Sequence, residues 1–150
     1  MRLTTHTDYA LRVLVFLAVA PVDRVRIREI AEAYAISHHH LTKVVQELQQ
    51  RGLIVTVRGK RGGISLARPI GAINIGDVVR QLEGMDYLVE CFSPDNRCVI
   101  TGACTLPKAL GEAIEAFMAA LDRYTLEDIV CQRAGALRAA WRLDEPGAGS

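Results

Sequence analysis

The chain has 150 residues, a formal net charge of +1 and 50% hydrophobic residues, enough to bury the core of one small domain. No apolar run reaches the roughly 18 residues of a membrane span, and the apolar stretch near the start lacks a basic leader, so a membrane or secreted protein is not expected. The four cysteines therefore indicate reduced thiols or metal ligands in a cytoplasmic protein rather than disulfides.

The near-neutral net charge of the chain is the sum of a basic first half and an acidic second half. Residues 1–70 contain eleven Lys and Arg against five Asp and Glu, whereas residues 71–150 contain seven against twelve. All four histidines lie in the basic half. This division favours a polyanionic partner for the first half alone, although a chance distribution of surface charge is the alternative.

Residues 4–20 predict a helix that is apolar around much of its circumference, which is typical of a helix that is buried or shared with a partner. Asp8 and Arg12 interrupt the apolar positions four residues apart, so both side chains face the same way and can form a surface ion pair.

Residues 27–48 predict two short amphipathic helices joined by a tight turn near Ala35, which is the spacing of a helix-turn-helix. A generic helical hairpin is the alternative. The second helix would be the recognition helix, and consecutive histidines about 100° apart on it suit a metal poorly. We expect DNA contacts from its capping residue and its exposed side, namely Ser37, His38, His39, His40, Thr42 and Lys43, with Gln46 further along.

Residues 52–68 predict a β-hairpin with β-branched strands and a basic, glycine-rich loop. A basic hairpin directly after a recognition helix is typical of a wing that reaches a phosphate or the minor groove. Its expected contacts are Arg58, Lys60, Arg61 and Gly62. Residues 1–70 are therefore expected to form a winged helix-turn-helix domain that binds double-stranded operator DNA.

The second half predicts a connecting helix and cysteine loop over 71–104, then a long and a short helix over 105–131. Residues 132–150 are expected to form a tail whose end is disordered. Apolar residues recur every three or four positions from Thr105, the expected cap, to Tyr124, with Pro107 in the first turn. This stripe predicts a homodimer, and packing onto the chain's own winged domain is the alternative. The fold class is mainly α with a small β-wing.

Cys91, Cys98 and Cys104 are separated by six and five residues in a stretch with turn-forming residues. These gaps are wider than those of a structural zinc knuckle and suit a larger group such as an iron–sulfur cluster. Zinc and redox-sensitive thiols are alternatives, and no catalytic motif predicts an enzyme. Three thiolates leave one iron for another ligand: Cys131, Glu90, Asp95, an exogenous molecule or a side chain of the basic half.

Over about residues 1–130 the chain resembles the IscR/NsrR family of iron–sulfur winged-helix transcriptional regulators. The resemblance rests on several segments and on the three cysteines of the loop. The segments are MRLTTHTDYALR at 1–12, the IS turn at 36–37, VRGKRGG at 57–63, IGDVVRQLE at 75–83 and YTLEDIV at 124–130.

Pro107 stands where the IscR branch has a histidine ligand, so the chain is more similar to the NsrR branch of nitric-oxide-sensing repressors. The resemblance implies a homodimer that holds a 4Fe–4S cluster, or a 2Fe–2S cluster, on the three cysteines and loses DNA affinity on nitrosylation. It also implies that Asp8 reaches the cluster of the other subunit, with Arg12 orienting it. Sensing of cluster supply or oxidation is the alternative. His38 departs from the arginine common in the family.

Overall fold

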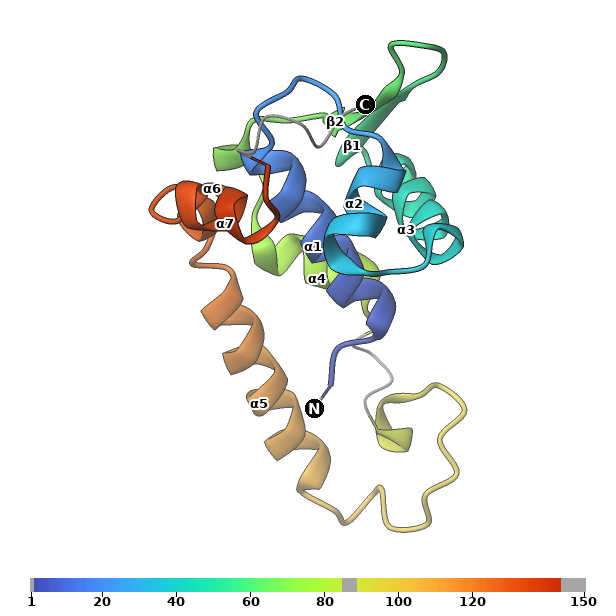
Figure 1. The fold of residues 1–150 in the computed structure, drawn as a ribbon. Coiled ribbons are helices and arrows are strands. Elements are labelled where there is room, and N and C mark those ends of the chain that lie inside the picture. The colour runs from blue at the N-terminus through green and yellow to red at the C-terminus, as the bar shows by residue number, and fades with distance from the viewer. Residues whose placement is uncertain (1, 85–88, 144–150) are drawn as a thin grey trace.

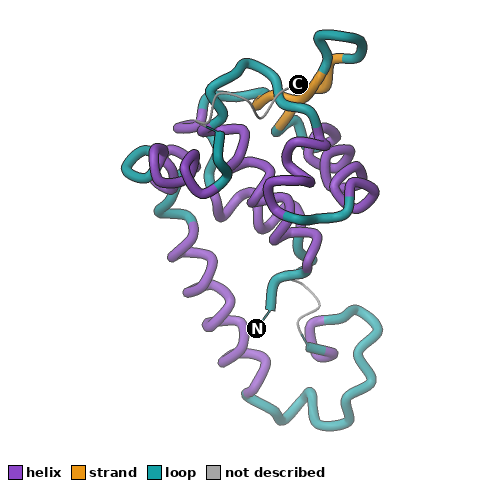
Figure 2. The backbone as a smooth tube through the Cα atoms, in the orientation of Figure 1, coloured by secondary structure: helices purple, strands orange, loops and turns teal. Residues whose placement is uncertain are grey.

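The computed structural model describes residues 2–84 and 89–143 and confirms a mainly α fold with a small two-stranded sheet (Figures 1 and 2). None of the helices in these two ranges is long and apolar enough to cross a membrane. The elements in chain order are α1 (Thr5–Val19), α2 (Ile27–Tyr34), α3 (His38–Gln50), β1 (Ile54–Val57), β2 (Gly63–Leu66), α4 (Ile75–Leu82), α5 (Leu106–Leu121), α6 (Leu126–Val130) and α7 (Ala134–Ala140).

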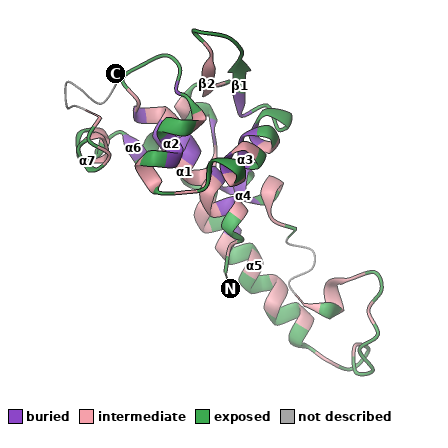
Figure 3. Cartoon of the chain, turned by 45° about the vertical axis from the view of Figure 1, so that its right-hand side comes forward, coloured by how far each residue is buried: buried purple, intermediate pink, exposed green. Residues whose placement is uncertain are grey.

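Helix α1 lies at the centre of the molecule and packs against α3, α4, α6 and α7 (Figure 1). Its first turn is capped by Thr4, whose hydroxyl accepts a hydrogen bond from the Thr7 N–H at 3.2 Å. Val13, Leu14 and Phe16 are almost fully buried, and Figure 3 shows the buried positions gathered around α1. The predicted apolar circumference of this helix is therefore explained by neighbours on several sides.

The hairpin pairs β1 with β2 in antiparallel register, with Ile54 opposite Leu66 and Val57 opposite Gly63. Val25, from the loop before α2, adds a bridge on the other side of β2. Its N–H donates to Ile64 O at 3.0 Å, and its carbonyl accepts from the Ile64 N–H at 2.7 Å. The loop before the helix-turn-helix is thereby joined to the hairpin that follows it.

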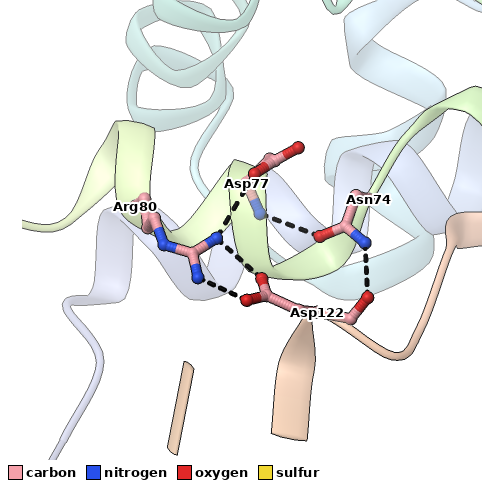
Figure 4. A network of polar contacts seen from close by, with 4 residues as sticks. All are labelled: Asn74, Asp77, Arg80 and Asp122. Carbon is pink, nitrogen blue, oxygen red and sulfur yellow. Dashed lines mark hydrogen bonds and ion pairs between the residues drawn. The ribbon is translucent and has the colours of Figure 1, made fainter. Parts of the chain in front are cut away.

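Helix α4 begins after Asn74, whose side chain accepts the Asp77 N–H at 3.1 Å. The same amide group donates to the Asp122 carbonyl, and Arg80 binds the Asp122 carboxylate (Figure 4). Ile75 also donates its N–H to Tyr124 O at 2.9 Å. These contacts join α4 to the end of α5.

Helix α5 extends away from the remaining helices (Figure 1), and Met118 is its single buried residue. The helix ends at Leu121 and not at Tyr124, since the chain turns there toward α6. The expected cap is wrong: Thr105 has a helical backbone and makes no capping hydrogen bond through its side chain. Pro107 lies in the first turn, as expected, where its missing N–H removes no helical hydrogen bond.

The expectation of a tail from residue 132 is wrong for its first part, because residues 134–140 form α7. Trp141 places its ring 4.8 Å from that of Phe16 and 5.4 Å from that of Tyr34. Arg138 Nε donates to Val19 O at 2.8 Å. These contacts hold the segment on α1 and α2, whereas its own sequence, AGALRAA, shows almost no apolar stripe. Of the expected disordered end, residues 143–150, all but Leu143 lie outside the described residues.

Candidate nucleic-acid interface and cysteine loop

The turn between α2 and α3 is formed by Ala35, which has left-handed backbone angles of φ 53° and ψ 44°. A residue with a Cβ atom adopts this conformation at a cost, and the adjacent Ile36 N–H donates to Ala31 O at 2.9 Å to close the turn. Ser37 then caps α3 by accepting the His40 N–H. The predicted helix-turn-helix and the start of its recognition helix are therefore confirmed.

Six polar side chains of the recognition helix α3 are exposed. They are His38, His39, Lys43 and Gln46, and the two residues at its C-terminal end, Gln49 and Gln50. Thr42 is half-buried and its hydroxyl donates to the His38 carbonyl at 2.9 Å, so its methyl group is the part left for a partner. This face carries cationic and hydrogen-bonding groups, and its contact with DNA stays a prediction.

His40 differs from the other two histidines of the triplet. It is half-buried, with its ring 4.7 Å from Tyr9 in an edge-on arrangement and 6.4 Å from His6. Consecutive helical positions point in different directions, so the residue after two exposed histidines turns back toward α1. The expectation that the first turn presents all three histidines is wrong for His40, which packs between two helices.

The wing loop, residues 58–62, exposes Arg58, Lys60 and Arg61, as predicted. Gly59 has a φ of 104°, which favours glycine. Gly62 is required for space, because a Cβ atom there would collide with the Val57 carbonyl oxygen. The loop is therefore a tight, basic tip.

Two arginines before α2 support this wing, and the sequence interpretation had not assigned them a role. Arg26 Nη2 donates to Lys60 O at 2.6 Å, and Arg24 Nη1 donates to Arg61 O at 3.1 Å. The two arginines alternate with Val25, which pairs with β2. Alternate residues of an extended segment point to the same side. The positions of Arg24 and Arg26 on either side of Val25 could therefore have indicated that both face the wing.

The cysteine loop, residues 89–105, leads directly into α5 (Figure 1). Cys91 and Cys104 are half-buried, Cys98 is exposed, and all three are free thiols. The Asn96 side chain accepts the Cys98 N–H at 2.9 Å, and Thr101 donates its hydroxyl to Cys98 O at 2.8 Å. Local hydrogen bonds thus shape the loop around its middle cysteine.

Across residues 2–84 and 89–143, no three His, Cys, Asp or Glu side chains come close enough together to hold a metal ion. The structure therefore does not bring the three cysteines into one ready-made site. The donor set nevertheless fits a thiolate-bound cluster. Cys104 Sγ accepts the Leu106 N–H, with 3.4 Å between sulfur and nitrogen, so a backbone donor already faces this sulfur at the start of α5.

Asp8 and Arg12 form the expected ion pair on α1, with 2.8 Å between Asp8 Oδ2 and Arg12 Nη2. The Arg12 guanidinium also lies over the rings of Tyr9 and Tyr34, at 5.7 and 5.6 Å from their centroids. Burial raises the pKa of Tyr34 to about 12, and the positive charge of Arg12 offsets only part of this. Asp8 is thus held by an arginine that aromatic rings position.

The other candidate oxygen and sulfur ligands lie in different surroundings. Glu90 is engaged within the cysteine loop, where its side chain accepts the Arg97 N–H at 3.0 Å. Asp95 is exposed on the same loop. Cys131 caps the C-terminus of α6, which lies at the opposite end of α5 from the cysteine loop (Figure 1). A cluster on the loop is therefore out of reach of Cys131 within one chain.

Residues 3–132 match the Rrf2 family, described as iron-dependent transcriptional regulators. This chain belongs to the Rrf2 family. Its relatives include the transcriptional regulator NsrR of Geobacillus kaustophilus, 51% identical over 136 residues that cover 89% of this chain and 92% of the relative. NsrR of Bacillus subtilis is 49% identical over 132 residues, which cover 87% of this chain and 90% of the relative.

Solved structures of Rrf2 regulators share the fold. CymR, the global cysteine regulator of B. subtilis, superposes with a TM-score of 0.71 at 28% identity, over 88% of this chain and 98% of that one. IscR of T. potens superposes with a TM-score of 0.72 at 25% identity, over 91% of this chain and 90% of that one. The winged helix-turn-helix fold and a role as transcriptional regulator rather than enzyme, both predicted from the sequence, are therefore confirmed.

Proposed function

We propose that this Rrf2 regulator is a cytoplasmic, homodimeric repressor that binds operator DNA and loses affinity for it when nitric oxide reacts with an iron–sulfur cluster. The observation that carries the proposal is the joint presence of two separate surfaces. One is the exposed recognition helix with its basic wing, and the other is a loop with three free cysteines. The similarity to NsrR regulators supports the same assignment.

Cys91, Cys98 and Cys104 would hold the cluster, which we take to be 4Fe–4S, with 2Fe–2S as the alternative. Asp8 of the partner subunit would be the fourth ligand. When bound, the cluster supplies an iron whose carboxylate ligand is weaker than its thiolate ligands and is therefore the point that nitric oxide can reach.

Exposed apolar side chains on the cysteine loop and on α5 support the homodimer. Val99, Ile100 and Leu106 expose 96%, 57% and 56% of their surface in the single chain. Large exposed apolar groups at one end of a chain are typical of a surface that a partner covers. A second copy would cover this end of α5 and bring its own α1, with Asp8, to the loop.

The side chains of α1 offer a route from the cysteine loop to DNA. Asp8 lies on the same helix as His6 and Tyr9, which contact the recognition helix. His6 Nε2 is 2.7 Å from Glu47 Oε2, and the Tyr9 ring packs on His40. A small displacement of α1 would therefore move α3 directly, and a tenfold loss of DNA affinity needs only about 1.4 kcal/mol.

The test is a nitric-oxide titration of anaerobically purified protein, followed by absorption and by operator binding in parallel. We expect about four irons per chain and a loss of DNA binding that tracks the bleaching of the cluster. Because coupling between two sites is reciprocal, operator DNA should shift the titration to higher nitric-oxide concentration. A cluster that ignores nitric oxide but changes DNA binding on oxidation or iron loss would favour a regulator of cluster supply or redox state.

Two matched variants test the ligands. Asp8→Ala should change the absorption spectrum and the response to nitric oxide, because it removes the proposed oxygen ligand. Cys131→Ser should leave both unchanged, since α6 lies far from the loop. An Asp8→Ala protein with the wild-type spectrum and titration would contradict the proposed fourth ligand without affecting the three cysteines.

A further inference from the structure

A hollow of about 390 Å³ lies between the first turn of α2, the start of the recognition helix and the wing. It is lined by Arg26, the N-cap residue of α2, by Arg28 in the first turn of α2, by His38 of α3, and by the wing glycines Gly59 and Gly62. Among the described residues that line it, none is an Asp or a Glu. The hollow therefore combines cationic side chains with glycines and, among the described residues, no lining carboxylate.

The wing wall of this hollow is held in place by hydrogen bonds. Arg26 Nη2 binds Lys60 O at 2.6 Å, and the Gly62 N–H binds Gly59 O at 2.9 Å. A Cβ atom at Gly62 would collide with Val57 O and Gly59 O of the wing's own backbone, so the tight turn requires glycine there. Gly59 and Gly62 therefore add no side chain to this wall, and the anion-binding groups of the hollow are the side chains of the other walls.

The neighbouring carboxylates leave Arg28 available. The Glu29 side chain accepts the Arg26 N–H at 2.6 Å and so is engaged as a helix cap. Glu32 Oε1 lies 3.8 Å from Arg28 Nε, and both side chains are more than 70% exposed. A long, exposed pair of this kind contributes little, so a stronger anion can replace Glu32.

We propose that this hollow binds one backbone phosphate of duplex DNA, held chiefly by Arg28 and His38, with Arg26 positioning the wing that forms the opposite wall. The planar guanidinium suits a phosphate. Such a contact fixes the register of a DNA reader without specifying a base. It would seat the recognition helix and the wing on the duplex together. This inference rests on the proposed DNA-binding face.

The first test compares Arg28→Gln with the wild type in operator binding over a salt series. We expect roughly tenfold weaker binding, equal for operator and scrambled duplex, and a fall of about one unit in the slope of log K against log salt. Glu32→Gln should strengthen binding, since it removes the competing carboxylate. Arg133→Gln, the same charge change on the turn before α7, should alter neither quantity.

The second test locates the phosphate with duplexes in which one phosphate at a time is a neutral methylphosphonate. The wild type should lose affinity at one position in each half-site where Arg28→Gln loses none. Identical profiles for the two proteins, or an Arg28→Gln protein with wild-type affinity, would overturn the inference. Arg28-dependent binding of inorganic phosphate together with identical profiles would likewise overturn the assignment to DNA.

Two controls separate this inference from the proposed function and from folding. If the wild-type protein binds no duplex, the proposed function itself is contradicted. If the wild type binds normally and Arg28→Gln binds equally well, only the proposed phosphate site is contradicted. Arg28 is exposed, so the variant should melt at the wild-type temperature. Arg28→Lys should recover part of the salt slope, because it restores the charge without the planar guanidinium.

Discussion

Arg80 and Asp122 join α4 to the end of α5 through two parallel contacts, Nη1 to Oδ1 at 2.6 Å and Nη2 to Oδ2 at 2.5 Å (Figure 4). Asn74 adds a hydrogen bond from its side-chain amide to the Asp122 carbonyl at 2.8 Å. Because a two-point arginine–carboxylate pair fixes direction as well as distance, this contact sets the angle at which α5 leaves the winged domain.

The pH dependence of stability tests this pair. The hydrogen bond from Arg80 lowers the pKa of the Asp122 carboxyl group below its ordinary value. The contribution of the Arg80–Asp122 pair to the stability of the fold is therefore complete above the unfolded-state pKa of aspartate. This contribution is lost as the pH falls through the lower folded-state pKa. We expect Arg80→Gln to melt below the wild type at neutral pH, with the gap closing in acid. A difference in melting temperature between the two proteins that is the same at every pH would contradict this role of the pair. Arg133→Gln, which removes an arginine elsewhere, is the control.

Gly76→Ala should destabilise the protein although it adds a better helix former to α4. A Cβ atom at this buried position would collide with the Asp122 carboxylate that Arg80 holds. Gly135→Ala in α7 is the matched control, because a Cβ atom there meets no atom within 4 Å. It should be neutral or stabilising by up to about 1 kcal/mol. Denaturant unfolding of both variants measures the difference, and equal effects would count against the close approach at Gly76.

Trp141→Ala should lower the free energy of unfolding by about 2 kcal/mol, since it removes ring contacts with Phe16 and Tyr34. Trp141→Phe should keep most of the stability. The chain has a single tryptophan, so its fluorescence in the wild type reports directly on the docking of α7. An unfolding free energy unchanged in Trp141→Ala would show that α7 adds nothing to the core.

Tyr34 should titrate well above the ordinary pKa of a tyrosine, which is 10.0. Burial raises its pKa to about 12, so its contribution to stability is full below the unfolded-state value near 10 and is lost as the pH rises toward 12. Tyr34→Phe keeps the ring but loses the hydrogen bond to Arg12 O at 3.3 Å. We expect it to reduce the alkaline loss of stability, measured by melting and by tyrosinate absorbance. An identical alkaline profile would contradict the raised pKa.

Elements whose causes are local could be predicted from the amino-acid sequence alone. The cap at Ser37, the glycines and basic residues of the wing, and the apolar repeat of α5 all act within a few neighbouring residues, and each predicted element is present. The capping box of α6, in which Thr125 and Asp128 each accept the other's backbone N–H, has an equally local cause. Helix existence and turn chemistry follow from periodicity and from short-range hydrogen bonds.

Contacts between side chains of distant segments, in contrast, depend on how the helices pack. His40 was expected at the DNA surface, but the position of Tyr9 on another helix turns it inward. Helix α7 lacks a strong apolar stripe of its own, and contacts of Arg138 and Trp141 with α1 and α2 hold it in place. The support of the wing by Arg24 and Arg26 likewise spans more than thirty residues. Such contacts depend on chain packing, which no local pattern encodes.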